Sequence, residues 1–371
     1  MIETRCVGMI AALVFAALGA AGLGRAQVQT DLPPEVPGAK SLTVQDIKVL
    51  AASLEGNLEG ESTDRDVIVF LPPSYFNDKH RRYPVVYALH GFSIGAEQWT
   101  HEIHVPQTIE GAFGQGAREM IVVLPDSKTF YGGSMYSSSE TTGDFERFIY
   151  HDVVSYIDAH YRTMPDRLSR GLAGHSMGGY GALRIGMKHP DIFGALYVMS
   201  PCCLSPRMAD RRPNTAQQGN SVQATDLEKV IAGLKFPAEA AALPFGVKAQ
   251  LASAAAWSPD PKNPPLYLDL PVKGGVPQPD ILAEWAANAP LAFIGQYIDN
   301  LRQYRAIALD VGDQDGLRFD TTKVHKILDD YGIRNSFEIF QGTHTSRVAY
   351  RFQEHVIPFF SKNLCFSDNC R

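Results

Sequence analysis

Short, almost uniformly apolar runs alternate along most of the chain with stretches whose apolar residues recur at helical spacing. Residues 84–89, 120–126 and 193–199 are runs of the first kind, which are typical of strands buried on both faces of a sheet. Residues 144–161 instead carry an apolar stripe three and four positions apart, which predicts a helix with one buried face. This alternation predicts an α/β fold with a mostly parallel central sheet and flanking helices.

Further elements of both kinds complete this pattern. Five more strands are predicted, at residues 47–54, 66–71, 167–173, 304–311 and 336–340. The first two of these are expected to pair antiparallel at the start of the sheet. Three more helices are predicted between and after them, at residues 180–187, 321–331 and 348–360.

Residues 205–300 depart from this rhythm. They are rich in Ala and Pro, and helical pieces are predicted near 226–234, 247–256 and 280–302, with a possible kink at Pro290. We interpret this segment as a helical cap inserted over the strand ends, with Trp257 and Trp285 as candidate apolar walls of a binding site. A peripheral insertion that never touches substrate is the alternative. The sheet and its helices would then occupy residues 43–204 and 301–362.

The first 26 residues have the features of a secretory signal. Arg5 precedes an apolar, alanine-rich run at residues 7–23, and small residues follow at Gly24 and Ala26. A retained membrane anchor is the weaker reading because the run is short and rich in small residues. We therefore predict an exported protein, periplasmic or secreted, with no stable membrane insertion after removal of the signal. Residues 27–42 are predicted to form a flexible lead, and 363–371 a C-terminal tail.

The chain has 371 residues and a formal net charge of −6 without a basic block, so we predict no nucleic-acid partner. Removal of the signal leaves four cysteines, which allow three disulfide pairings: Cys202, Cys203, Cys365 and Cys370. A disulfide within the tail would suit an oxidising compartment, whereas the adjacent pair fits free thiols, a vicinal disulfide or bonds to the tail. Because there is no Cys-x-x-Cys pair, we predict no metal site, and we predict no cofactor.

The motif Gly174-x-Ser176-x-Gly178 is the strongest chemical signal in the sequence. A predicted strand precedes it and a predicted helix follows, which is the context of a nucleophile elbow that exposes a serine at a sharp turn. A chance match is the alternative, because the chain contains 32 glycines. The strand–turn–helix context favours Ser176 as a catalytic nucleophile.

A serine nucleophile needs a general base and an acid that orients that base. His344 follows a predicted strand on a glycine-containing loop, and the chain order Ser, Asp, His is that of α/β-hydrolases. Three aspartates compete for the role of the acid: Asp310, Asp313 and Asp315. Their spacing alone does not separate the last two.

Five short motifs together resemble the esterase D family of serine hydrolases, which includes feruloyl and acetyl-xylan esterases, S-formylglutathione hydrolases and mycolyl-transferring enzymes. The motifs are LPPSY at 71–75, YPVVY at 83–87, LHG at 89–91, GHSMGGYGA at 174–182 and KHP at 188–190. The resemblance covers about residues 45–205 and 304–362. It implies the α/β-hydrolase fold, His344 as the base and, from the Gly-x-x-Asp turn at 312–315, Asp315 as the acid. The backbone N–H groups of Phe92 and Met177 would then form the oxyanion hole.

These features predict a serine carboxylesterase that works through an acyl-enzyme, on hydroxycinnamoyl, acetyl or other bulky esters. The substrate would be a small molecule or an ester group attached to a polymer. An acyltransferase with the same triad, or a non-catalytic binding protein on this scaffold, are the alternatives. The sequence does not indicate an oligomeric state. Five side chains are predicted to contact substrate: Trp99, Tyr136, His175, Trp257 and Trp285. The 139 positions between Ser176 and Asp315, and the Ser200–Cys203 segment, depart from the family pattern.

Overall fold

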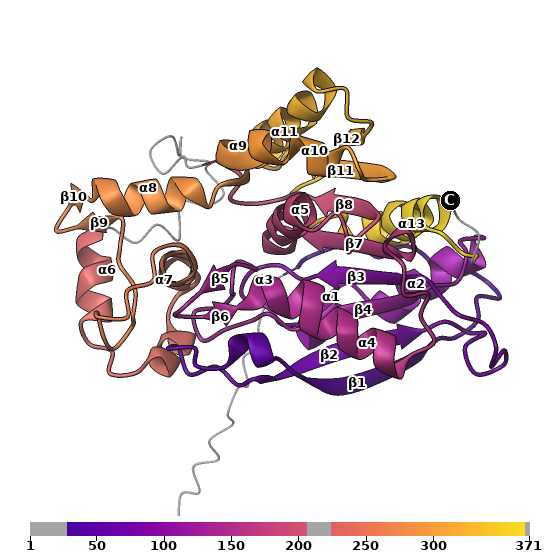
Figure 1. Ribbon diagram of the computed structural model, residues 1–371, viewed down its shortest axis with the longest axis horizontal. Coiled ribbons are helices and arrows are strands. Elements are labelled where there is room, and N and C mark those ends of the chain that lie inside the picture. The colour runs from indigo at the N-terminus through magenta and orange to yellow at the C-terminus, as the bar shows by residue number, and fades with distance from the viewer. Residues whose placement is uncertain (1–27, 206–223, 368–371) are drawn as a thin grey trace, which may run out of the picture.

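An eight-stranded sheet forms the centre of the computed structural model, which describes residues 28–205 and 224–367 (Figure 1). The first two neighbouring pairs of strands are antiparallel and the other five are parallel. From edge to edge the strands are β1 Thr43–Leu50, β2 Asp64–Leu71, β4 Ile121–Pro125, β3 Val85–Leu89, β7 Arg170–His175, β8 Ala195–Met199, β11 Ala306–Gly312 and β12 Ser336–Phe340. The mostly parallel sheet predicted from the sequence is therefore present.

The alternation of side chains along each strand divides the core into two layers. In β3, Val85, Tyr87 and Leu89 belong to one cluster of buried residues, whereas Val86 and Ala88 belong to the other. All five side chains are fully buried. The uniform apolar character of this strand thus reflects helices on both faces of the sheet.

Helices cover both faces of the sheet. The layer on the side of Tyr87 contains α3 Phe145–Arg147, α4 Val154–His160, α5 Met177–Lys188 and α11 Arg318–Asp330. The opposite layer contains α1 Ala96–Glu102, α2 Val105–Gly114, α12 Val348–Arg351 and α13 Ile357–Asn363. A π-helical turn joins α3 to α4 and another joins α12 to α13, so each pair forms one continuous helix, as predicted.

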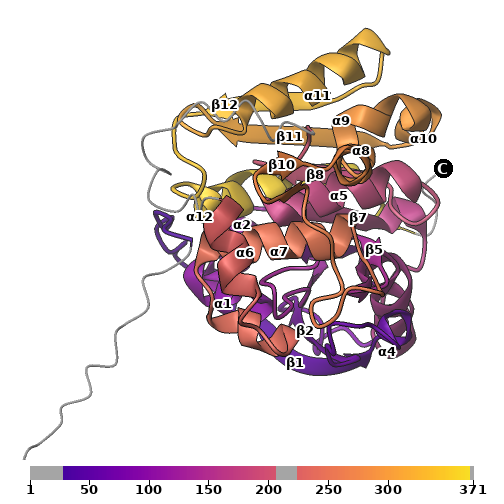
Figure 2. The same cartoon turned by 90° about the vertical axis from the view of Figure 1, so that its left-hand side faces the viewer.

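Three helices and a short hairpin gather at one end of the sheet, and Figure 2 shows them from that end. They are α6 Ala224–Ile231, α7 Phe245–Trp257, α8 Pro279–Ala287 and the hairpin of β9 Val272–Lys273 and β10 Val276–Pro277. We refer to residues 224–287 as the cap. Its loops are tied to the core by side-chain hydrogen bonds, among them one of 3.0 Å from the Tyr131 hydroxyl to the carbonyl of Leu266. The Ser139 hydroxyl donates in the same way to the carbonyl of Ala255 in α7.

The last part of the predicted insertion belongs to the core layers. The predicted helix at 280–302 is broken at Pro290, which has no N–H to donate and holds Ala289 in an extended conformation. Beyond this break, α9 Pro290–Phe293 and α10 Ile298–Leu301 pack beside α5. The side chain of Asn300 donates to the carbonyl of Met187 over 2.9 Å.

Two N-terminal predictions need correction. Residues 28–42, predicted as a flexible lead, pack along the core, where the Val28 N–H donates to Glu102 over 2.6 Å and the Asp31 N–H donates to the carbonyl of Ser346 over 2.8 Å. The first predicted strand, 47–54, is shifted. β1 begins at Thr43 and ends at Leu50, and a 3₁₀ turn at Ala52–Leu54 replaces the predicted strand end. Further 3₁₀ turns occur at Arg167–Ser169, Pro237–Ala242 and Ile294–Tyr297, and a small hairpin joins β5 Ser138–Ser139 to β6 Gly143–Asp144.

Several sequence predictions fall outside the described residues. These are the signal at 1–26, the start of the cap at 206–223 and the end of the tail, including Cys370. Among the residues that are described, none of the helices combines the length and the apolar character that a membrane crossing requires.

Candidate active site

Ser176 occupies the turn between β7 and α5. Its backbone has φ 59° and ψ −114°, a conformation that costs a residue with a side chain about 1–3 kcal/mol and that the surroundings must therefore impose. A Cβ on Gly174 would collide with the carbonyl of Gly178, and one on Gly178 would collide with the carbonyl of Leu89. Glycine at both positions lets strand and helix approach closely, and the serine side chain is left partly exposed at the turn.

His344 links Ser176 to an acid. Its Nε2 lies 2.9 Å from the Ser176 hydroxyl, and its Nδ1 lies 2.7 Å from Oδ2 of Asp315. The Leu317 N–H donates to the other carboxylate oxygen over 2.9 Å. Burial acts to raise the pKa of Asp315, but the hydrogen bonds from His344 and Leu317 outweigh it and hold this pKa below its usual value. The carboxylate is thus kept ionised beside the imidazole.

The other two candidate acids have different partners. Asp310 is buried and accepts hydrogen bonds of 2.8 Å from both the Tyr197 hydroxyl and Nε of Arg351. Asp313 accepts the backbone N–H of Gly342 over 2.9 Å and so anchors the loop that carries His344. Of the three aspartates, only Asp315 faces the imidazole.

His175, predicted to contact substrate, holds the His344 loop. Its Nε2 donates to the backbone carbonyl of His344 over 2.9 Å, and the two rings are 4.8 Å apart. Burial lowers the pKa of His175 to about 3, with a smaller contribution from His344, so the ring is neutral at working pH. Its position therefore indicates a role in orienting the base.

The loop after β3 lies against the serine turn, because an ideal Cβ on Gly91 would lie 3.6 Å from Cβ of Ser176. Among the described residues, no hydrogen-bond partner is found for the backbone N–H of Phe92 or of Met177, so both can donate to a ligand. Both groups lie beside the serine, and their role as an oxyanion hole stays a prediction. The neutral, buried His90 stiffens the loop by accepting the Ser127 N–H over 2.8 Å.

Tyr136, a predicted substrate contact, is hydrogen-bonded to the loop after β3. Its side chain is fully buried, and its hydroxyl donates to the carbonyl of His90 over 3.0 Å. Trp99 is also fully buried, but on the opposite face of the sheet, where its ring packs against Phe352 at 5.9 Å. Neither side chain has surface available to a substrate, so these two predictions find no support in the structure.

Trp257 and Trp285 pack against each other inside the cap, at 5.1 Å between ring centres. Only 9% and 8% of their surfaces are exposed. The Trp285 indole donates to the Ser258 hydroxyl over 2.9 Å, and Trp257 lies 5.9 Å from Tyr180 in α5. The two indoles therefore join the cap to the nucleophile helix and offer little surface to a ligand.

Phe245, which sequence reasoning missed, lies closer to the predicted chemistry. It is the first residue of α7, is 42% exposed, and packs edge-to-face on Phe92 with ring centres 5.2 Å apart. The cap thus contacts the loop that carries a predicted oxyanion donor. No local pattern marks Phe245, because the contact joins residues 153 positions apart in the sequence.

A buried carboxyl group supports the loop next to Phe92. Glu59 is 2% exposed and accepts the Tyr131 N–H over 2.9 Å, and the neighbouring Gly132 carbonyl accepts the Ser93 N–H over 2.8 Å. Burial, reinforced by the charge of Glu61, raises the pKa of Glu59 to about 8. The folded chain therefore keeps this carboxyl protonated at neutral pH.

We expect Glu59→Gln to stabilise the protein at pH 8 and to have little effect at pH 5. Between the ordinary pKa of 4.5 and about 8, the unfolded chain ionises Glu59 while the folded chain retains the proton, so stability falls as pH rises. The amide removes this loss and keeps the acceptor for Tyr131, a gain of up to about 4 kcal/mol at pH 8. Urea unfolding at both pH values measures it. The exposed Glu55→Gln is the control, and an equal effect at both pH values would contradict the pKa argument.

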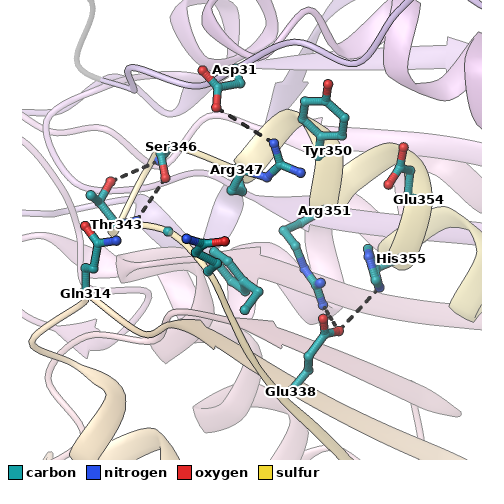
Figure 3. Close-up of a pocket in the computed structure, with 13 residues that line it drawn as sticks. Asp31, Gln314, Glu338, Thr343, Ser346, Arg347, Tyr350, Arg351, Glu354 and His355 are labelled. Carbon is teal, nitrogen blue, oxygen red and sulfur yellow. Dashed lines mark hydrogen bonds and ion pairs between the residues drawn. The ribbon is translucent and has the colours of Figure 1, made fainter.

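A pocket of about 590 Å³ is lined in part by Gly342, Thr343 and Ser346 from the loop that carries His344 (Figure 3). Its lining includes neither Ser176, His344 nor Asp315. Figure 3 shows the side chains of Arg351 and His355 converging on Glu338, with Arg351 2.7 Å from the carboxylate. These charged groups are engaged with one another, so we assign the pocket no part in the chemistry.

The described residues contain no group of three His, Cys, Asp or Glu side chains arranged to hold a metal ion. Cys202 and Cys203 are free thiols and lie just after β8. The disulfide predicted within the tail stays a prediction, because Cys370 lies outside the described residues.

Comparison with known proteins adds a family to this geometry. The model of the Esterase family, whose description is "Putative esterase", matches residues 61–358. An endo-1,4-beta-xylanase/feruloyl esterase of Xylanibacter ruminicola is 30% identical over 34% of the chain and 18% of its own length. An S-formylglutathione hydrolase of Paracoccus denitrificans is 23% identical over 38% of the chain and 54% of its own length. The chain thus spans about a fifth and about half of these two relatives.

The solved structure of a ferulic acid esterase superposes with a TM-score of 0.60 and 22% identity, over 88% of this chain and 100% of the other. This similarity shows the α/β-hydrolase fold, as the sequence motifs predicted.

Proposed function

The chain belongs to the esterase family, and we propose that it is a serine carboxylesterase that acts through Ser176, His344 and Asp315. One observation carries the proposal, namely the continuous line of hydrogen bonds from the Ser176 hydroxyl through His344 to Asp315. These are the distances at which a base removes the serine proton while an acid orients the base.

In the first half of the proposed reaction, the Ser176 oxygen attacks the ester carbonyl as His344 Nε2 takes its proton. The ionised Asp315 stabilises the imidazolium that forms. The negative charge on the carbonyl oxygen is stabilised by the backbone N–H groups of Phe92 and Met177. The imidazolium then protonates the departing alcohol, and the acyl group remains on Ser176.

In the second half, water replaces the alcohol and His344 again serves as the base. Attack of this water on the acyl-enzyme releases the carboxylic acid product. An alcohol in place of water would make the same acyl-enzyme a transferase intermediate. The buried, neutral His175 fits this cycle because it holds the His344 backbone without competing for the proton.

We propose aryl esters of the hydroxycinnamoyl type as the substrates. Two observations support this class: the name of the feruloyl esterase relative, and the exposed aromatic ring of Phe245 against Phe92. A rigid ring beside the oxyanion donor gives a planar acyl group an apolar wall at low entropic cost. The proposal that the protein is exported rests on the predicted signal at residues 1–26.

A panel of esters tests the function. Purified protein is given methyl ferulate, acetylated xylan and a short-chain aryl ester, and both free acid and acyl transfer to added methanol are measured. We expect release of acid to water, with ferulate preferred. Transfer that dominates at low methanol would favour the acyltransferase, and no turnover of any ester by folded protein would favour a binding protein.

Phe245→Ala should lower kcat/KM for methyl ferulate by about tenfold and change the rate with an acetyl ester by less than about twofold, because one aromatic contact contributes about 0.5–1.5 kcal/mol beyond its area. Phe236→Ala is the matched control, because Phe236 is a cap phenylalanine that is 63% exposed. Competition between the two esters measures the ratio directly. Equal losses on both esters, or equal effects of both variants, would remove Phe245 from the acyl pocket.

A further inference from the structure

Two adjacent cysteines lie beside the serine turn. Cys202 and Cys203 follow β8, and their Sγ atoms are 2.7 Å apart, whereas a disulfide bond is about 2.0 Å long. Both residues are partly exposed and both thiols are free. The two sulfurs therefore already face each other at a separation that small rotations of the side chains can close.

The backbone of this pair is tied directly to the nucleophile. The Cys202 N–H donates to the carbonyl of Ser176 over 3.1 Å, and the Leu291 N–H donates to the carbonyl of Leu204 over 2.8 Å. Cys203 has φ 60°, an uncommon value for a residue with a side chain. The Cα atom of Cys202 carries both this N–H group and the thiol side chain, so a displacement of Cys202 changes a hydrogen bond that positions the serine turn.

The pair also lies close to the acid. The hydrogen bond between the two thiols, together with burial, raises the pKa of the Cys202 thiol well above its usual value. The charge of Asp315 adds to this effect. The dithiol thus lies within electrostatic reach of the carboxylate that orients His344.

We propose that Cys202 and Cys203 form a redox-active dithiol that closes reversibly to a vicinal disulfide and so controls Ser176. The oxidant is a disulfide, R–S–S–R. One protein thiolate attacks it and releases the first thiol, and the second protein thiolate then attacks the mixed disulfide and releases the other. The protein loses two protons and two electrons, and the oxidant becomes two R–SH molecules. The eight-membered ring includes the Cα atom of Cys202, so its closure displaces this atom together with the attached N–H group and weakens the hydrogen bond to the Ser176 carbonyl.

The first readout is chemical and does not depend on any esterase activity. The full chain is reduced, desalted, exposed to buffers of oxidised and reduced glutathione, and alkylated before peptide mass mapping. We expect the peptide that contains both cysteines to lose two hydrogens and to resist alkylation in the oxidising buffers, and to recover with dithiothreitol. Cys203→Ser should instead give a glutathione adduct on Cys202, and Cys202→Ser the corresponding adduct on Cys203.

The second readout is the rate of ester hydrolysis, and it alone rests on the proposed function. Oxidation of the wild-type chain should lower kcat by about tenfold or more, because displacements near 1 Å in a catalytic group have effects of this order or larger. Dithiothreitol should restore the rate. Neither serine variant can form the disulfide ring, so both should lack the decrease in kcat that the ring causes. If Cys203→Ser does not fold, Cys203→Ala replaces it in this experiment.

Three outcomes would overturn the proposal. In the first, the pair remains fully alkylatable in every redox buffer. In the second, one of its cysteines is found bonded to a tail cysteine. In the third, the ring forms but the rate is unchanged. A chain without activity in either redox state, but with the ring formed, would count against the proposed function and against redox control of it, and not against the dithiol chemistry.

Discussion

Replacement of Ser176 by alanine should lower kcat for ester hydrolysis by about 10⁶-fold and leave the fold intact. A decrease of this size is typical when a triad serine is lost, because only substrate binding and the oxyanion donors still contribute to the rate. The substitution removes one oxygen atom from a partly exposed side chain, so little packing is lost. Steady-state rates on a short-chain aryl ester, with circular dichroism as the folding check, measure the effect.

The matched control for this variant is Ser62→Ala, because Ser62 is exposed and lies outside the site. It should retain the wild-type rate. A folded Ser176→Ala protein with a rate within tenfold of the wild type would show that another group carries the chemistry.

The second large effect should separate two aspartates that are two positions apart. Asp315→Asn should lower kcat by about 10⁴-fold, because an amide cannot stabilise the imidazolium and favours the wrong tautomer of His344. Asp313→Asn should lower it by about tenfold or less, because the amide oxygen can still accept the Gly342 N–H. Rates of both purified variants on the same ester give the comparison. The reverse ranking would exchange the roles that we give to the two carboxyl groups.

The sequence predicted the parts of this site that depend on local geometry. The serine turn needs glycines at 174 and 178 because of close backbone contacts, and such contacts leave a readable motif. The buried strands were also readable, because helices on both faces of the sheet demand uniformly apolar runs. The family pattern then distinguished Asp315 from Asp313, which spacing alone did not.

The sequence failed where a role depends on contacts between distant segments. Trp99 was a reasonable candidate for substrate binding, but α1 directs it into the core beside Phe352 on the face away from Tyr87. This helix and α2 were both missed, because each is short and a left-handed residue, His104, separates them. Phe245 carried no signal, since only folding brings it to Phe92.

The lead at residues 28–42 shows the same limit. Its polar, proline-containing composition is typical of flexible segments, yet backbone groups in it find partners at Glu102 and Ser346. Composition describes what a segment can bury by itself, and it does not report hydrogen bonds that the rest of the fold offers.

If Ser176 is the nucleophile, a fluorophosphonate, which phosphonylates activated serines, should react with it in the purified chain. Mass mapping of the modified peptide should show one label per chain, on Ser176, and labelling should be strongly slowed in Asp315→Asn. A label on another residue, or an unmodified Ser176 in treated protein that still hydrolyses esters, would show that another group is the nucleophile.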